Sequence, residues 1–400
     1  MVDFLPFKGL LPRLSDAESI DQRVAPPYDV ISPEELLGLQ AKPFNVSRIT
    51  LGGEGSNYER AARLLREWIK HGKLMKDEEE CYYLLTQTFT YQNHKITRTG
   101  LMGALRLEPY ENGNISPHEE TFPKVKEDRL NLLRATSAHL ESIFCIYDDM
   151  DIRLLDEMKE RAERIFTFID NYGTEHCFSR ISDNDMKSTL NAVLKNKKLL
   201  IADGHHRYET ALRYAQENTD DERKKYLLAT LVAGNDPGLA VLPTHRIFRN
   251  VQIGVDEFLL RASNFFAVWE ARSMDELFRL TANNSRPSLG VVMPGGRMFI
   301  LELAWRPSED PLWSIDAYVC EELILKKILE KKGEVKVEYD HDALSAVSKT
   351  EQEGVAMAII LSPPRMDLIW EVAKSGQRMP KKSTYFYPKV WSGFVIYDMG

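Results

Sequence analysis

The spacing of apolar residues predicts a helix early in the chain. In the segment NYERAARLLREWIKHGKL, apolar side chains recur at helical intervals, so that Tyr58, Ala61, Leu65, Trp68 and Ile69 fall on one helical face. This pattern is typical of a helix that buries one side and exposes the other. We therefore expect an amphipathic helix here, with its apolar face in a core.

A capped helix precedes this segment, and a pair of strands follows it. ISPEELLGLQ combines Ser32, a favoured N-cap, with Pro33 at the first helical position and Glu35 as the partner in a capping box. CYYLLTQTFTYQNHKITRTGLMGALRLEPY is rich in β-branched and aromatic residues and is interrupted at Asn93. The sequence thus predicts a helix that begins at Pro33 and antiparallel strands that turn near Asn93.

The segment KKLLIADGHHRYETALRYA joins a short apolar run directly to a helical pattern. KLLIA is bounded by turn-forming residues, which favours a buried strand. Beyond the DGHHR motif, Tyr208, Ala211, Leu212 and Ala215 recur at helical spacing. The predicted order is therefore a strand, a tight turn over residues 203–206, and a helix.

From about residue 251 the pattern changes, and a second α/β domain is expected. LGVVMPGGRMFILEL is a hairpin candidate with two glycines at its tip, and SIDAYVCEELILKKILEKKG is an amphipathic helix. EVKVEYDH, DALSAVSKTE and VAMAIILSP follow as strand, helix and strand, which predicts a parallel crossover unit. We expect a phosphate- or nucleotide-binding catalytic domain over residues 1–250, the second domain over 251–375, and a C-terminal segment, 376–400, that returns to the site. The expected fold class is mixed α/β (α+β).

Composition narrows the class of protein. The chain has 400 residues, of which 28% are charged, and its formal net charge is −8. A chain of this length usually forms more than one domain, and an acidic balance argues against wholesale binding of nucleic acid. The four cysteines include no C-x-x-C pair, and no apolar run reaches the length of a membrane span. We expect a cytoplasmic protein without nucleic-acid or membrane partners, and the oligomeric state is left open.

The DGHHR motif is the foremost candidate for chemistry. Backbone N–H groups at the start of a helix favour an anion, and Gly204 lets a ligand approach the backbone closely. Arg207 can make a forked contact with phosphate, and His205 and His206 can donate hydrogen bonds or transfer protons. Asp203 can hold Mg²⁺ or accept a proton from a hydroxyl group. The motif predicts a phosphate site with catalytic roles for the aspartate and the histidines; the structural alternative is a helix cap with two half-buried histidines.

A second polar segment could complete this site. SPHEETFPKVKEDRLNLLR supplies His118, Glu119 and Thr121 in a loop, where functional groups concentrate, and Arg129 in the helix that follows. A glutamate beside a histidine is a suitable general base. We expect Glu119 to be catalytic, His118 and Thr121 to contact substrate, and Arg129 to contact phosphate. A solvated loop followed by an ion-paired helix would explain the same residues.

Two more segments supply candidate ligand contacts. VAPPYDVISPEEL places Asp29 just before the capped helix, where it can contact a substrate, and RMPKKSTYFYPK carries Lys381 and Ser383, which can close over a phosphate as a C-terminal flap. A rigid turn and core packing are the structural alternatives. The chain contains neither the GxxxxGK[ST] phosphate loop nor the GxGxxG dinucleotide fingerprint, so a nucleotide would have to be bound differently.

Five of these segments together resemble a known family. APPYDVIS, PHEET, IADGHHRYETAL, LPTHR and MPKKSTYFYPK are similar to segments of the domain-of-unknown-function 1015 family of bacterial and archaeal proteins. They extend from Ala25 to Lys389, so the resemblance covers nearly the whole chain. The family name implies no activity, although the resemblance implies a genetic context of serine biosynthesis.

A more distant resemblance concerns the central motif. ADGHHRYETA is similar to the GCHR segment of sulfiredoxins and to the DGHHR-type segment of free serine kinases. The resemblance implies a ParB/sulfiredoxin-like nucleotide-binding core, in which residues 204–207 bind phosphate and Asp203 lies at the catalytic centre. His205 stands where sulfiredoxins have their cysteine, which argues against reduction of sulfinic acids. The catalytic glutamate of the kinases is not fixed by this alignment, and Glu119 and Glu35 are both candidates.

The first functional hypothesis is a phosphotransferase that acts on a small hydroxyl compound, with serine and phosphoserine as the best guess and with Mg²⁺ and ATP or ADP as cofactors. Asp203 would hold the metal, Glu119 or Asp203 would take the hydroxyl proton, and Arg129 or Lys381 would steady the transferred group. One alternative is a phosphoserine phosphatase that needs no nucleotide. The other is a non-enzymatic protein that senses a nucleotide or an amino acid. The expected partners are a small phosphorylated metabolite and a nucleotide.

Overall fold

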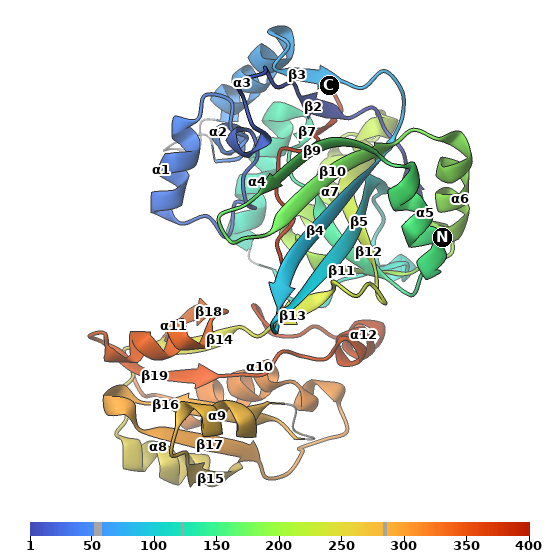
Figure 1. The fold of residues 1–400 in the computed structure, drawn as a ribbon. Coiled ribbons are helices and arrows are strands. Elements are labelled where there is room, and N and C mark those ends of the chain that lie inside the picture. Colours follow the sequence, from blue (N-terminus) through green and yellow to red (C-terminus); the bar gives the residue numbers. More distant parts are fainter. Residues whose placement is uncertain (52–57, 122, 283–285) are drawn as a thin grey trace. The chain divides into compact units, whose positions relative to one another are not determined.

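The computed structural model describes residues 1–51, 58–121, 123–282 and 286–400 (Figure 1). The described chain forms two compact units. Unit 1 comprises Met1–Pro117, Thr121–Ala240 and Pro388–Gly400, and unit 2 comprises His118–Glu120 and Val241–Tyr387. The chain thus changes unit after Ala240, whereas the sequence pattern placed a boundary near residue 250.

Unit 1 is built around a mixed nine-stranded sheet. Its strands are β1 (Phe4–Leu5), β4 (Tyr82–Tyr91), β5 (His94–Arg106), β6 (Ile115–Ser116), β8 (Ile143–Tyr147), β9 (Glu163–Ile169), β10 (Glu175–Ile181), β11 (Leu199–Asp203) and β12 (Tyr226–Ala233). Eight of them lie in the order β6-β11-β8-β12-β5-β4-β10-β9, and β1 pairs with β5. β8 runs parallel to β12 but antiparallel to β11, so the sheet mixes both kinds of pairing.

Shorter strands and several helices complete unit 1. Two small sheets pair β2 (Leu10–Pro12) with β3 (Leu74–Lys76) and β7 (Ala138–His139) with β21 (Tyr397–Asp398). The helices are η1 (Ile20–Gln22), α1 (Pro33–Ala41), α2 (Ser47–Thr50), α3 (Tyr58–Lys70), η2 (Tyr110–Asn112), α4 (Pro123–Thr136), α5 (Ile152–Arg161), α6 (Asn184–Leu194), α7 (His205–Glu217) and η3 (Glu222–Lys225). Helix α7 packs against β8 and β12, α4 against α7, and α3 against α4.

Local sequence patterns account for several of these elements. Ser32 caps α1 and accepts a hydrogen bond from the Glu35 N–H at 3.2 Å, as predicted. The hairpin β4–β5 turns at Gln92 and Asn93, which have φ values of 48° and 63°. The predicted order of strand, turn and helix around the DGHHR motif is also confirmed, as β11 followed by α7.

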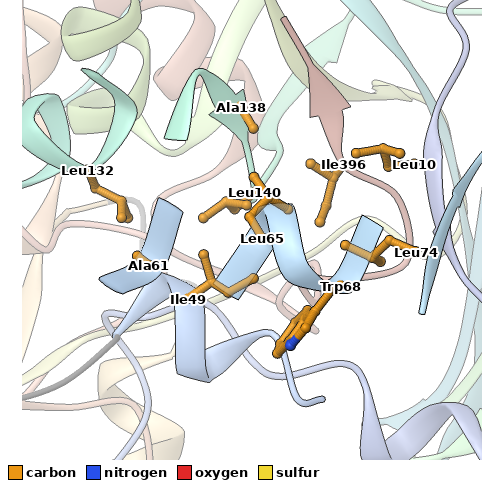
Figure 2. Packing of buried hydrophobic residues seen from close by; sticks show 10 residues of the cluster. All are labelled: Leu10, Ile49, Ala61, Leu65, Trp68, Leu74, Leu132, Ala138, Leu140 and Ile396. Atoms are coloured by element: carbon orange, nitrogen blue, oxygen red, sulfur yellow. The ribbon is translucent and has the colours of Figure 1, made fainter. Parts of the chain in front are cut away.

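The apolar face of α3 joins a core cluster that draws on distant parts of unit 1. Ala61, Leu65 and Trp68 of α3 are buried against α4, β7 and the C-terminal segment (Figure 2). Tyr58 packs partly buried against the same cluster. The prediction was wrong for Ile69, whose side chain is 38% exposed. Since Trp68 and Ile69 are consecutive, they point about 100° apart on a helix, and only one of them reaches the centre of the core.

Unit 2 contains a six-stranded antiparallel sheet. The strands, in their order across the sheet, are β15 (Phe266–Glu270), β17 (Met298–Leu303), β16 (Ser288–Val292), β19 (Val355–Ile360), β14 (His245–Arg249) and β18 (Lys336–Asp340). The remaining elements of this part of the chain are β13 (Ala240–Leu242), α8 (Val255–Ala262), α9 (Met274–Thr281), η4 (Pro294–Gly296), η5 (Pro311–Ser314), α10 (Asp316–Val319), η6 (Cys320–Ile328), α11 (Ala343–Ser348), η7 (Lys349–Glu351), α12 (Met366–Lys374) and β20 (Tyr385–Tyr387).

Three sequence predictions for unit 2 can be compared with the folded chain, and one of them, the crossover unit, needs correction in part. The hairpin β16–β17 forms around Gly295 and Gly296, as expected. β18 and β19, joined through α11, run parallel to each other, as a crossover unit requires, but they are not neighbours, because β14 lies between them and is antiparallel to both. The predicted amphipathic helix forms over residues 316–328, with α geometry in α10 and π geometry in η6. The periodicity of local sequence does not reveal an inserted strand from elsewhere in the chain.

The mixed α/β class expected from the sequence is confirmed by both units. The four cysteines are free thiols, three of them buried. Within the described ranges, the helices are too short or too polar to cross a membrane.

Candidate functional site

The turn between β11 and α7 has a geometry that only glycine satisfies. Gly204 is the N-cap of α7 and has φ 92° and ψ 27°, in the left-handed region. A Cβ atom at this position would lie 2.9 Å from Ile143 Cγ2 and 3.1 Å from Arg207 Nε. Because other residues would meet both backbone strain and steric overlap, this position requires glycine, and glycine leaves the start of α7 without a side-chain cap.

An irregularity in β11 sets the direction of Asp203. The pairing of β11 with β8 shifts register between Ile201, opposite Cys145, and Asp203, opposite Phe144. Bulges of this kind bend a strand and turn its side chains, and they are frequent beside functional sites. Asp203 therefore projects from the end of the strand next to the helix N-terminus, with 15% of its side chain exposed.

Asp203 is held between two cationic side chains. Its Oδ2 accepts a hydrogen bond from Arg207 Nη2 at 2.5 Å, and its Oδ1 pairs with Lys389 Nζ. Arg207 also donates from Nη1 to the Ser142 carbonyl at 2.5 Å. Burial opposes the charge of Arg207, but Asp203 and Glu141 overcome this and raise the pKa of the guanidinium. The cluster is therefore a compact, charged and only slightly exposed group.

A second carboxylate lies beside Arg207. Glu141 is 8% exposed and accepts hydrogen bonds at Oε1 from the Tyr28 N–H, at 3.1 Å, and from Ser392 Oγ, at 3.2 Å. Burial, and to a smaller extent the neighbouring Asp29, raises the pKa of the Tyr28 phenol. Asp29 itself is exposed next to α1. The predicted substrate contact at Asp29 thus lies near a buried acidic and basic group that the sequence alone did not reveal.

Arg129, a predicted phosphate contact on α4, also belongs to this neighbourhood. Its guanidinium lies 4.4 Å from the centre of the Tyr28 ring. It pairs with Asp128 at 2.5 Å and donates to the Thr50 carbonyl at 2.9 Å. Arg129 is therefore fixed in position by a stacked ring, a carboxylate and a carbonyl.

Thr121 connects the loop before α4 to α7. Its hydroxyl donates to Glu209 Oε2 at 2.9 Å, and Lys126 Nζ contacts the same oxygen at 2.9 Å. The hydroxyl of Thr121 is thus bonded to α7 in this structure, and the substrate contact expected of it stays a prediction.

The two histidines of the motif open α7. His205 is 7% exposed, and His206 is half-buried. Both positions lie within the first turn, next to Asp203. Their catalytic roles, and the choice between them, stay predictions.

The remaining predicted residues lie in unit 2, where PHEET and PKKST meet. His118 is fully buried, with Nε2 2.9 Å from Thr384 Oγ1, and its carbonyl accepts from the Met379 N–H at 2.8 Å. Glu119 Oε1 accepts from the N–H of Lys382. The two segments, far apart in sequence, are thus joined by hydrogen bonds within one unit.

The predicted flap residues are part of a folded turn. Ser383 is 2% exposed, and its hydroxyl donates to the Pro380 carbonyl at 2.6 Å. The Lys381 carbonyl accepts from Arg246 Nη2 at 3.5 Å. The Ser383 hydroxyl is therefore engaged with the backbone in this structure, and a phosphate contact there stays a prediction.

Sequence reasoning missed Lys389, Glu141 and Arg98. Lys389 closes the quoted segment MPKKSTYFYPK, but its pairing with Asp203 spans 186 positions and has no local pattern. Arg98 is buried within the sheet, where it donates to Gln87 Oε1 at 2.5 Å and to the Pro388 carbonyl. Burial lowers the pKa of Arg98 to about 10. Arg98 thereby fixes the residue next to Lys389, and only the folded sheet brings them together.

The donor set does not favour a metal ion at Asp203. Within the described ranges, groups of three or more His, Cys, Asp and Glu residues with metal-binding geometry do not occur. Both carboxylate oxygens of Asp203 are paired with cations. Mg²⁺ at this position therefore does not fit the arrangement described, and we derive no chemical step from it.

Comparison with known structures gives remote likenesses. A conserved hypothetical protein from Pyrococcus furiosus is similar at a TM-score of 0.37 and 15% identity, over 70% of this chain and 89% of that one. A free serine kinase in complex with AMP is similar at 0.38 and 14%, over 68% and 84%. SbnI from Staphylococcus aureus, with a C-terminal truncation, is similar at 0.38 and 10%, over 74% and 86%. We derive no function from likenesses at this level.

Sequence comparison is more decisive about the family. Among curated proteins, no relative matches the chain. A family model described as a protein of unknown function, DUF1015, matches residues 4–318, which is more than half of the sequence and includes the β11–α7 motif. The chain therefore belongs to the DUF1015 family.

Proposed function

We propose that this protein transfers a phosphoryl group between a nucleotide and the hydroxyl group of a small metabolite, with serine and phosphoserine as the first pair to test. The observation that carries the proposal is the position of Asp203 at the N-terminus of α7, held between Arg207 and Lys389. Phosphoryl transfer depends mainly on positioning and on charge neutralisation. A helix start without a side-chain cap, together with two cations and a carboxylate, supplies both requirements.

Each group has a role in this proposal. The first-turn N–H groups of α7 hold phosphate oxygens, because the N-cap residue Gly204 provides no side-chain cap for them. Arg207 has five N–H groups and its described contacts use two, so the others can neutralise charge on the transferred group. The hydroxyl oxygen forms the new P–O bond while the bond to the nucleotide breaks. Asp203 accepts the hydroxyl proton.

The proposal is tested by ³¹P NMR on the purified protein with phosphoserine, first alone and then with AMP or ADP. We expect a new nucleotide phosphoanhydride signal, and the reverse transfer with ATP and serine. Parallel samples with MgCl₂ and with EDTA decide whether the transfer needs a divalent cation. Inorganic phosphate released without nucleotide would instead indicate a phosphatase, and nucleotide binding without turnover would indicate a sensor; either result overturns the proposal.

Variants locate the activity at this turn. Arg207→Ala and Lys389→Ala should reduce transfer by at least about a hundredfold, as is typical when a positioned charge is removed from a transition state. Arg213→Ala is the matched control, since Arg213 also lies on α7 but is 56% exposed in surface ion pairs. Equal activity in all three variants would exclude the β11–α7 turn as the site.

A further inference from the structure

A small hollow in unit 1 adjoins the Asp203 cluster and has no role in the function described so far. It lies among α4, β7, α7 and β12, and its volume is about 50 Å³. That is room for about three to five water molecules, or one compact metabolite. Leucines of α4 form an apolar part of its wall, and five polar residues line it as well: Arg129, His139, Glu141, Arg207 and Thr210.

His139 is the unusual member of this wall. The residue is 9% exposed, and its Nε2 has no hydrogen-bond partner among the described residues. Burial lowers the pKa of the imidazole to about 4, although a hydrogen bond to the Tyr226 backbone acts in the opposite direction. The ring is thus neutral at physiological pH, and because its other nitrogen donates to a backbone carbonyl, Nε2 is a bare acceptor. A buried acceptor without a donor requires an explanation.

Two other polar groups that line the hollow, Arg207 and Glu141, carry opposite charges. Arg207 keeps N–H groups beyond those that contact Asp203 and Ser142. Glu141 uses Oε1 for its described hydrogen bonds, which leaves Oε2 for a cationic donor. The hollow therefore offers an anion contact, a carboxylate and a neutral acceptor on an apolar wall. This combination complements a zwitterion and not a simple anion.

We propose that the hollow is the subsite for the hydroxyl-bearing substrate and that it takes a small α-amino acid, with its carboxylate on Arg207 and its ammonium group between Glu141 and His139 Nε2. This inference rests on the proposed function, because Arg207 is shared between the hollow and the Asp203 cluster. The small volume selects against long side chains. His139 then determines specificity, because its Nε2 favours a substrate that carries a hydrogen-bond donor at this position.

Binding of L-serine, measured by calorimetry, tests the subsite directly. Two probes each lack one charged group: 3-hydroxypropionate has no ammonium group, and ethanolamine has no carboxylate. We expect each to bind at least tenfold more weakly than L-serine. Equal binding of all three, or no binding of L-serine at millimolar concentration, would overturn the proposal and leave water as the occupant.

His139→Phe separates a binding role from a structural role. Phenylalanine keeps a ring that can stack on Tyr397, as His139 does with ring centres 6.0 Å apart. It also removes Nε2, the acceptor that has no donor in this structure. We expect serine affinity to fall at least tenfold while the melting temperature changes little, because phenylalanine removes the unpaired Nε2 and also the hydrogen bond to the Tyr226 backbone. A lower melting temperature with unchanged serine affinity would show that His139 is structural.

His245→Phe is the matched control in unit 2. His245 is also buried, and burial likewise lowers its pKa to about 4, but its Nδ1 accepts a hydrogen bond from the Leu361 N–H at 3.1 Å. Its replacement should lower the melting temperature and leave serine binding unchanged. Phosphoryl exchange is followed in the same variants. If His139→Phe still exchanges phosphate with an unchanged KM for serine, the amino-acid subsite is refuted but the proposed function is not. If the protein binds serine but exchanges no phosphate, the phosphotransferase is refuted but the subsite is not.

Discussion

Two aspartates, one in each unit, are stabilised in opposite ways. In unit 1, Asp203 lies between Arg207 and Lys389 and stays partly exposed. In unit 2, Asp316 is buried at the start of α10, where Oδ2 accepts the Ser362 N–H at 2.8 Å. Burial raises the pKa of Asp316 to about 7, and the backbone hydrogen bonds and the charge of Arg246 offset this only in part.

Under the proposed function, the difference separates a carboxylate that takes part in chemistry from one that stabilises the fold. A carboxylate with two cationic partners at a helix start keeps its charge and can interact with a charged ligand. A carboxyl group that is surrounded mainly by backbone dipoles is protonated more easily and serves to join segments of the fold. The following predictions test this contrast, from the largest expected effect to the smallest.

The largest effect on stability should come from Arg98, the buried arginine that holds the residue next to Lys389. Arg98→Met removes the donors to Gln87 Oε1 and to the Pro388 carbonyl. A buried acceptor left unsatisfied costs roughly 1–3 kcal/mol. We therefore expect the free energy of unfolding, measured in urea, to fall by several kcal/mol. Both hydrogen bonds are donated by Nη2, and Arg98→Lys should recover only part of the loss, because an ammonium group does not reproduce the planar geometry of the guanidinium. A loss below about 1 kcal/mol would mean that unit 1 does not depend on this charge.

Asp316 should make stability depend on pH in the direction opposite to a salt-bridged carboxylate. The pKa of Asp316 is about 7 in the folded protein, which lies above the value in the unfolded chain. Its contribution to the free energy of unfolding is therefore fully present below about pH 4 and is lost as pH rises through about 7. The wild type should lose up to about 1.4 kcal/mol per pH unit in this window relative to Asp316→Asn. Denaturation curves from pH 4 to 8 measure the difference, in which other titrating groups cancel. Parallel pH profiles would contradict the raised pKa.

Two glycines with positive φ provide a matched pair. Gly204 has φ 92° and close neighbours, whereas Gly295, at the tip of the β16–β17 hairpin, has φ 78° and open space around its Cα. Alanine at either position costs about 1–2 kcal/mol for the left-handed backbone. Gly204→Ala must also displace Ile143 or Arg207, so it should be the more destabilising variant and should reduce phosphoryl transfer. Equal melting temperatures for both variants would show that the turn has room for a side chain.

The smallest effects should come from helix caps, where the units behave alike. Ser32 caps α1 in unit 1, and Ser273 caps α9 in unit 2, with hydrogen bonds of 3.2 Å and 3.1 Å from backbone N–H groups. Ser32→Ala and Ser273→Ala should each cost about 1 kcal/mol, as seen for N-caps in general, and neither should change activity. Loss of transfer in Ser32→Ala would extend the site to α1.

The sequence by itself determined elements whose causes are local. Ser32 and Glu35 specify the start of α1, the spacing of Ala61, Leu65 and Trp68 specifies the buried face of α3, and Asp203–Gly204 separates a strand from a helix. These features depend on residues within a few positions of one another, so periodicity and capping chemistry reveal them.

The tertiary structure decided which distant residues meet. β14 enters the sheet between β18 and β19, and Lys389 reaches Asp203 although 186 positions separate them in the chain. Likewise, Glu141 and His139 become a polar wall only when β7 packs near α4 and α7. Such contacts are set by strand register and by burial of whole faces, which leave no trace in local spacing. The sequence therefore identified the β11–α7 turn together with Arg207, and the tertiary structure added Lys389, the second cation beside Asp203.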